Sequence, residues 1–261
     1  MTKHTKITID ASNSPLQLVP YSKGRLYTQT RTLGLSETSF DNAMRFDTVA
    51  RLTQDIAAAD MADAGLEDQG VWVVRRTYIR IFENAKYRDN LTISTFCAGL
   101  GRAWAQRRTD VTLGDTTVAQ VSSLWIQTDP QTRTPKSLTP EFQNIFAESA
   151  GERKVTHRLE IVEQPSSKKF DWHWRIADFD LLGHLNNAVY FEVGEELLAK
   201  IQTPAIDRRG LSMIAEYKEG INLGQSNEIR LFSSQTHDAQ FDFIADGLVQ
   251  AGLYLITSHE K

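Results

Sequence analysis

The chain has 261 residues, of which 41% are hydrophobic and 24% charged, and its formal net charge is −4. This balance is typical of a globular protein and argues against a nucleic-acid-binding domain, which is usually basic. No apolar run is long enough to span a membrane, the N-terminus lacks the apolar core of a secretion signal, and the single cysteine, Cys97, has no internal partner, so we expect a cytoplasmic protein.

The N-terminal half is predicted to contain antiparallel strands and one long helix. The helix is expected at Phe40–Ala64, because Phe46, Val49, Leu52 and Ile56 recur at spacings of three and four. Elsewhere in this half, apolar and polar residues alternate, which is typical of half-buried antiparallel strands. The predicted strands are Arg25–Leu35, Trp72–Phe82, Asn90–Gly99, Trp104–Leu113 and Val118–Thr128.

The C-terminal half shows the same sequence of patterns after a linker that carries prolines and serines. A short helix is expected at Thr139–Glu148, at the start of that linker. Alternation predicts a strand at Phe170–Asp178, and the spacing of apolar residues predicts a helix at Asn187–Gln202. The strands predicted after this helix are Ser212–Ile221, Glu228–Ser233, Gln240–Asp246 and Leu248–Thr257.

The two halves are interpreted as an internal repeat, each a strand, a long helix and a curved antiparallel sheet. We align Asn42 with Asn187, which places Ser39 opposite His184. A helix enclosed by an antiparallel sheet is the hotdog arrangement, so the predicted fold class is α+β, a double hotdog. The predicted divisions are an N-terminal hotdog unit at 1–138, a linker at 139–167, and a C-terminal hotdog unit at 168–261.

Chemistry-bearing residues gather in the C-terminal half, where a strand is expected to give way to a helix. The segment reads Asp180-Leu-Leu-Gly183-His184-Leu-Asn186-Asn187. Asn186 and Asn187 are typical N-cap residues, and the first turn of a helix offers unpaired N–H groups and the positive end of its dipole. Such donors can stabilise the oxyanion that develops on a carbonyl under nucleophilic attack. Gly183, without a side chain, lets a ligand approach the backbone.

Asp180 and His184 are the predicted catalytic residues of this segment. Asp180 is expected either to activate water or to attack the carbonyl itself, and desolvation in an apolar pocket is expected to raise its pKa. His184 is expected to polarise the carbonyl or to orient the carboxylate and the water. A plain helix-capping turn, with His184 merely exposed, is the structural alternative.

The segment from Asp180 to Tyr190 resembles the Asp-x-x-Gly-His-x-Asn-Asn-x-x-Tyr signature of hotdog thioesterases. The first helix, read from Arg45 as RFDTVARLTQDIA, and the Trp125–Lys136 passage are similar to those of plant and bacterial acyl-carrier-protein (ACP) thioesterases. This resemblance implies hydrolysis of fatty acyl-ACP in fatty-acid synthesis, with acyl carrier protein as partner and no cofactor. It also implies a supporting carboxylate at Glu196, an N-terminal unit that forms a wall of the acyl pocket, and a C-terminal unit that carries the catalytic motif.

The sequence departs from the plant-like pattern in two places. Leu182 stands where those enzymes have asparagine, and Gly220 stands where they have a glutamate on a later strand. Glu219 is adjacent, but a shift of one residue in a strand turns a side chain to the opposite face unless a bulge intervenes. Cys97 is interpreted as a small core residue and not as a nucleophile.

Other functions remain open at this stage. An acyl-CoA thioesterase of the same fold shares the motif, and a non-catalytic acyl-thioester sensor would use the fold without a base. The histidines show no ligand spacing, so no metal site is expected; a homodimer is left open. The basic pairs are interpreted either as solvated strand ends or as a landing site for an acidic carrier. They are Arg75-Arg76, Arg107-Arg108, Lys168-Lys169 and Arg208-Arg209.

Overall fold

The computed structural model describes residues 17–159, 168–201, 207–233 and 239–256. Its helices are α1 (Phe46–Asp63), α2 (Pro140–Ala150) and α3 (Val189–Ile201), with short 3-10 helices η1 (Leu35–Glu37) and η2 (Ile176–Asp178). The strands are β1 (Tyr27–Thr32), β2 (Val71–Ile81), β3 (Asn90–Leu100), β4 (Trp104–Leu113), β5 (Thr116–Thr128), β6 (Lys168–Phe170), β7 (Ser212–Tyr217), β8 (Asn227–Ser233), β9 (Ala239–Ala245) and β10 (Leu248–Ile256).

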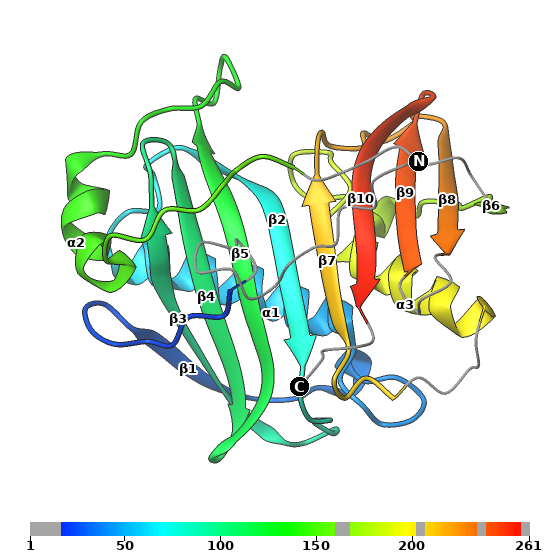
Figure 1. Cartoon of the computed structure of the whole chain (residues 1–261), viewed down its shortest axis with the longest axis horizontal. Coiled ribbons are helices and arrows are strands. Elements are labelled where there is room, and N and C mark those ends of the chain that lie inside the picture. The colour runs from blue at the N-terminus through cyan, green and yellow to red at the C-terminus, as the bar shows by residue number, and fades with distance from the viewer. Residues whose placement is uncertain (1–16, 160–167, 202–206, 234–238, 257–261) are drawn as a thin grey trace, which may run out of the picture.

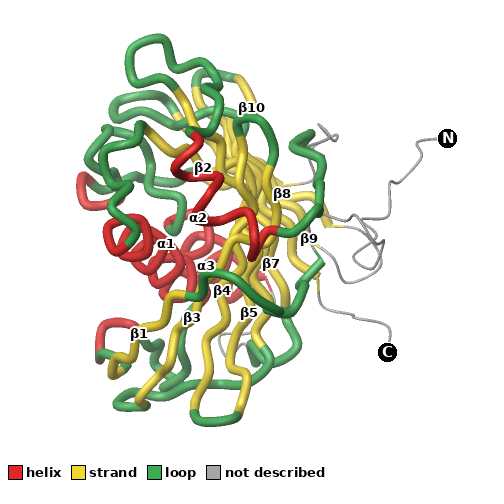
Figure 2. The backbone as a smooth tube through the Cα atoms, turned by 90° about the vertical axis from the view of Figure 1, so that its left-hand side faces the viewer, coloured by secondary structure: helices red, strands yellow, loops and turns green. Residues whose placement is uncertain are grey.

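All of these strands belong to one antiparallel sheet, in the order β1-β3-β4-β5-β2-β7-β10-β9-β8-β6. The strands of the N-terminal half form one side of the sheet and those of the C-terminal half the other, and the halves meet where β2 pairs with β7 (Figure 1). Helices α1 and α3 pack together on one face of this sheet (Figure 2). The predicted α+β double hotdog is therefore confirmed.

The core lies between this pair of helices and the sheet. Phe46, Val49, Leu52 and Ile56 of α1, which the spacing predicted to face inward, are each at most 2% exposed. They join a continuous apolar cluster that extends through α3 and the strands of both halves. Burial of one such side chain stabilises a fold by about 1.5–3 kcal/mol, so the two helices are held mainly by this shared core.

A buried ion pair lies at the joint between the halves. Arg76 of β2 is the register partner of Glu216 of β7, and its Nη2 lies 2.6 Å from Glu216 Oε1. The two side chains are 3% and 2% exposed. Arg76 also donates to the carbonyl of Arg158, at 2.6 Å, so the linker is tied to the same joint.

The strand predicted at Phe170–Asp178 is wrong beyond its first residue. Only residues 168–170 pair with β8, and residues 176–178 form the 3-10 helix η2. Alternation in burial does persist as far as Trp174, which is buried, so this segment is extended. Beyond Phe170 this segment pairs with no strand among the described residues, since its pairing with β8 ends there.

Other boundaries differ by a few residues. Helix α1 begins at Phe46 and not at Phe40, because a tight loop closed by a bridge between Thr38 and Met44 precedes it. Helix α2 occupies the start of the segment predicted as a linker, and Thr139 caps it by accepting a hydrogen bond from Phe142 N. Residues 160–167 of that linker lie outside the described residues, as do Gln202 and Thr257, so the division into units stays a prediction.

The internal repeat is present, but its register differs from the predicted alignment. The bridge between Thr38 and Met44 recurs between Phe179 and Leu185. In the first loop, Ser39 N–H donates to the carbonyl of Ala43 at 3.0 Å; in the second, Asp180 N–H donates to that of His184 at 2.8 Å. Ser39 is therefore the counterpart of Asp180, and Ala43 that of His184.

The predicted alignment, with Ser39 opposite His184, was thus wrong by about one helical turn. Such a shift keeps the apolar face of a helix in place, since residues four apart lie on the same face. The loops decide the register. Asn42 and Gly183 are matched within them, and both have positive φ angles, 59° and 74°.

Candidate active site

Residues 178–186 form a tight loop directly before α3. Asp180 N–H donates to the carbonyl of His184 at 2.8 Å, and Gly183 N–H donates to that of Asp180 at 3.0 Å. Gly183, at φ 74°, adopts the left-handed conformation that this turn needs and that glycine tolerates best. The loop therefore brings Asp180 and His184 onto one turn, as the sequence predicted. The close approach of a ligand to Gly183 stays a prediction.

One oxygen of the Asp180 carboxylate is fixed by its own loop. Oδ1 accepts hydrogen bonds from the backbone N–H of Leu182 at 2.9 Å and of His184 at 3.1 Å. Oδ2 accepts no hydrogen bond within the part of the chain that the structure describes. Burial, and after it the charge of Asp180, raises the pKa of the Tyr190 phenol well above its ordinary value, so these two motif residues lie close enough to interact. The Asp180 carboxylate is thus fixed through Oδ1, while Oδ2 has no hydrogen-bond donor among the described residues.

His184 is half-buried and lies against the loop that follows β7. Leu185 N–H donates to the carbonyl of Ile221 at 2.8 Å, which joins the two loops. A Cβ atom on Gly220 would approach the His184 ring to 2.9 Å at Cγ, so glycine is what lets the ring lie there. The ring nitrogens have no hydrogen-bond partner among the described residues.

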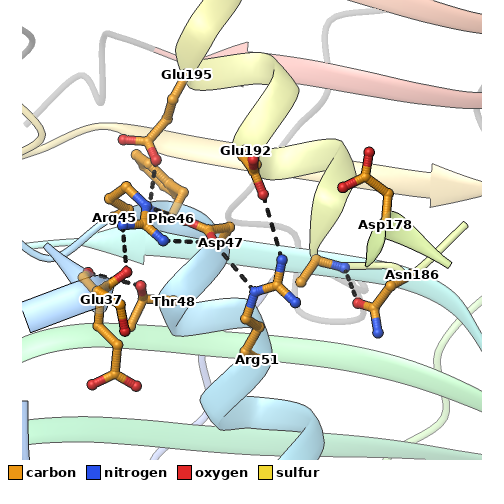
Figure 3. A network of polar contacts seen from close by, with 12 residues as sticks. Glu37, Arg45, Phe46, Asp47, Thr48, Arg51, Asp178, Asn186, Glu192 and Glu195 are labelled. Atoms are coloured by element: carbon orange, nitrogen blue, oxygen red, sulfur yellow. Dashed lines mark hydrogen bonds and ion pairs between the residues drawn. The ribbon is translucent and has the colours of Figure 1, made fainter. Parts of the chain in front are cut away.

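Asn186 and Asn187 stand at the N-terminal end of α3. Asn186 Oδ1 accepts from Ala188 N–H at 2.9 Å in the turn that leads into α3, and Asn186 N–H donates to the carbonyl of Asp178 (Figure 3). The hydroxyl of Tyr217 donates to the carbonyl of Asn187 at 2.9 Å. These contacts hold the positive end of the α3 dipole beside the Asp180–His184 turn.

The two supporting carboxylates are not brought to this turn. Glu196 is exposed on α3 and pairs with Lys200 at 3.2 Å. Glu219 is exposed, and its backbone N–H donates to the carbonyl of Gln250 at 3.1 Å. Neither side chain has a recorded contact with Asp180 or His184 within the described residues.

Sequence reasoning missed Glu195, which lies beside Glu196 but is buried. Its Oε2 accepts from the backbone N–H of Phe46 at 3.0 Å, so a residue of α3 caps the first turn of α1 (Figure 3). Its Oε1 pairs with Arg208, which also reaches Asp41 of the first-half loop. Burial raises the pKa of the Glu195 carboxyl to about 7. Only the docking of the two helices creates these contacts, so no local pattern could predict them.

A cavity of about 560 Å³ lies beside this first-half loop. Neither Asp180 nor His184 lines it. Phe40 and Arg45 line it from the chain between η1 and α1. Trp172 and Arg175 line it from the segment before η2, and Glu192 and Glu195 line it from α3.

The basic pairs do not form an exposed landing site as a set. Four of their arginines are buried in ion pairs and serve the interior of the fold, which corrects both interpretations of these residues. The buried members are Arg76, Arg107, Arg108 and Arg208, and their partners are Glu216, Asp60, Asp110 and Glu195, respectively.

Cys97 is buried as predicted, and burial raises the pKa of its thiol to about 11, which disfavours a nucleophilic thiolate.

Comparison with known families decides what the two halves are. Residues 24–146 match the acyl-ACP thioesterase N-terminal domain, and residues 160–247 match the acyl-ACP thioesterase C-terminal domain. The chain belongs to the acyl-ACP thioesterase family. Its reaction class is therefore thioester hydrolysis. Among the described residues, no helix is both long enough and apolar enough to cross a membrane.

Solved structures agree with this fold. An acyl-ACP thioesterase from Bacteroides thetaiotaomicron superposes with a TM-score of 0.69 at 17% identity, over 88% of this chain and 97% of that one. A 12:0-ACP thioesterase from Umbellularia californica gives a TM-score of 0.73 at 15% identity, over 90% and 97%. An uncharacterized protein of Mycobacterium tuberculosis is 27% identical over 242 residues, 90% of this chain and 93% of its own length.

Proposed function

We propose that the chain hydrolyses fatty acyl-ACP to a free fatty acid and acyl carrier protein, as a cytoplasmic enzyme of fatty-acid synthesis. Asp180 and His184 are the proposed catalytic residues, and no cofactor takes part. The observation that carries the proposal is the shared turn on which these residues lie. Asp180 Oδ2 and the His184 ring both lack a hydrogen-bond partner within the described residues, and both lie beside the N-terminal end of α3.

In the proposed reaction, the thioester carbonyl lies near the first turn of α3. Asp180 Oδ2 takes a proton from water as the water oxygen attacks the carbonyl carbon. The oxyanion that forms is stabilised by His184 and by donors at the helix end. The C–S bond then breaks, the thiol leaves with a proton, and the acid is released. Direct attack by Oδ2 uses the same free oxygen and forms an acyl anhydride that water then hydrolyses.

Acyl-ACP is the proposed donor because both halves of the chain match models of acyl-ACP thioesterases. The double hotdog relatives from Bacteroides thetaiotaomicron and Umbellularia californica are themselves an acyl-ACP and a 12:0-ACP thioesterase. Asp180 also favours an enzyme over a sensor, since a protein that only binds a thioester needs no base beside the carbonyl.

The experiment is steady-state hydrolysis of matched acyl-ACP and acyl-CoA panels, from eight to eighteen carbons. We expect kcat/KM on acyl-ACP to exceed that on the same acyl-CoA by at least about tenfold, or about 1.4 kcal/mol. Equal efficiency on both donors would instead support an acyl-CoA thioesterase. Binding of acyl thioesters without turnover would support the sensor.

A further inference from the structure

The repeat register gives each long helix a counterpart contact at the N-terminal end of the other. Glu195 of α3 accepts from Phe46 N–H at the start of α1, at 3.0 Å. At the matched position of α1, Gln54 Nε2 donates to Asn186 Oδ1 before the start of α3, at 3.4 Å. Both pairs cross from one half of the chain to the other.

The two ends differ in hydrogen-bonding character. At the start of α1, the Glu195 carboxylate occupies the Phe46 N–H group, so a substrate oxygen would meet an acceptor there. Asn186 is matched by Arg45, whose guanidinium is held by Asp47 at 2.7 Å. The polar groups at the start of α1 are therefore already paired within the protein. At the start of α3, the crossing side chain is a neutral amide that presents a donor.

The contact from Gln54 bears on how Asn186 is oriented. Asn186 Oδ1 already accepts from Ala188 N–H at 2.9 Å, and Gln54 supplies a second donor to the same oxygen. Two donors fix Oδ1 on the protein side, so the other end of the amide, Nδ2, faces away from them. Nδ2 has no hydrogen-bond partner among the described residues.

We propose that Gln54 is a positioning residue of the active site, contributed by the N-terminal half, which fixes the Asn186 amide so that Nδ2 donates to the thioester carbonyl. The inference rests on the proposed function. It gives the N-terminal half a polar part in the reaction beyond a wall for the acyl chain. A contact of 3.4 Å is long for a hydrogen bond, and such contacts in active sites tighten when substrate binds.

The test is a double-mutant cycle in kcat on the acyl thioester that the parent hydrolyses fastest. Gln54→Ala is expected to lower kcat about tenfold with KM changed less than about twofold, because a donor that acts on the developing oxyanion affects the chemical step. In an Asn186→Ala background, Gln54→Ala should have no further effect, since Gln54 acts through Asn186. Additive losses would overturn the proposal, because they would show that Gln54 acts by packing.

An isosteric variant keeps the test free of packing effects. Gln54→Glu retains the size of the side chain and replaces the donor by an acceptor, so kcat should fall at least as far as in Gln54→Ala. The ratio of variant to parent kcat should rise toward acidic pH, as the new carboxyl gains a proton and donates again. Ala58→Glu, one turn along α1 and exposed, is the charge-matched control and should retain parental kcat.

The outcomes separate this inference from the proposed function. If the parent hydrolyses no acyl thioester, the proposed function fails, and this inference fails with it. If the parent is active and both Gln54 variants turn over like the parent, with unchanged urea denaturation midpoints, only the role of Gln54 is overturned.

Discussion

Gly220 lies directly behind the imidazole ring of His184. A Cβ atom on Gly220 would come within 2.9 Å of His184 Cγ and 3.1 Å of Cδ2, closer than such atoms pack. The position at which plant-like relatives are expected to have a glutamate is therefore filled here by the histidine ring. His184, the predicted polarising residue, can occupy this position only because residue 220 has no side chain.

Replacing Gly220 should disturb the reaction more than the fold. Gly220→Ala is expected to displace the His184 ring and to lower kcat at least about tenfold, about 1.4 kcal/mol of barrier. Because residue 220 is exposed, the thermal midpoint should change little. Steady-state kinetics and thermal melts of the variant measure both effects. Parental kcat in Gly220→Ala would show that the placement of this ring does not matter.

Glu219 is predicted to be dispensable. Its side chain is exposed and contacts neither Asp180 nor His184, the proposed catalytic residues, within the described part of the chain. Glu219→Gln should therefore keep kcat and KM within about twofold of the parent, and it serves as the matched control for Gly220→Ala. A loss beyond about tenfold with an intact fold would mean that Glu219 has taken over the role of the missing carboxylate.

The buried Arg76–Glu216 ion pair, where β2 meets β7, allows a prediction about the free energy of unfolding. Arg76→Met removes one partner of this buried ion pair, and such a loss typically costs about 3–5 kcal/mol. Arg76→Met combined with Glu216→Leu should cost clearly less, because an apolar pair leaves no unpaired charge. Urea denaturation of the single and double variants measures this difference. A double variant as unstable as the sum of the singles would contradict it.

Glu195 predicts a pH dependence of stability. Its folded pKa of about 7 lies above the ordinary value of 4.5, so the folded state binds the proton more tightly than the unfolded chain does. The raised pKa therefore contributes at most about 3 kcal/mol to the free energy of unfolding. This contribution is fully present below about pH 4.5 and is lost as pH rises through about 7.

Glu195→Gln should remove this part of the pH dependence while keeping the shape of the side chain. Urea denaturation of parent and variant between pH 4.5 and 8 compares the two slopes. Identical slopes would show that the Glu195 carboxyl does not titrate in this window, and that its pairing with Arg208 keeps it ionised.

The sequence predicted the long helices and the Asp180–His184 turn because their signals are local. Apolar spacing marks a helix face, and an Asp-x-x-Gly-His run before two asparagines marks a tight turn that leads into a helix cap. The strand predicted at Phe170–Asp178 shows the limit of such signals. Alternation reports an extended chain that is buried on one side, and it does not report whether a neighbouring strand is there to pair with it.

Contacts between distant residues were beyond the reach of the sequence pattern. The repeat register was misplaced by about one helical turn because both alignments bury the same face of each helix. The contacts of Glu195 with Phe46, of Gln54 with Asn186 and of Gly220 with His184 form only when the halves and loops dock. Each joins residues that are far apart in the sequence, and no periodic pattern of residues marks such a contact.

The most direct test of the account is the kcat of Asp180→Asn on acyl-ACP. Asparagine keeps the Oδ1 contacts to Leu182 and His184 and replaces only Oδ2, the proposed base or nucleophile. We expect kcat to fall at least about a hundredfold with acyl-ACP still bound. Ser39→Ala, at the first-half counterpart, should retain parental kcat. Near-parental turnover by folded Asp180→Asn would place catalysis elsewhere in the molecule and contradict the account.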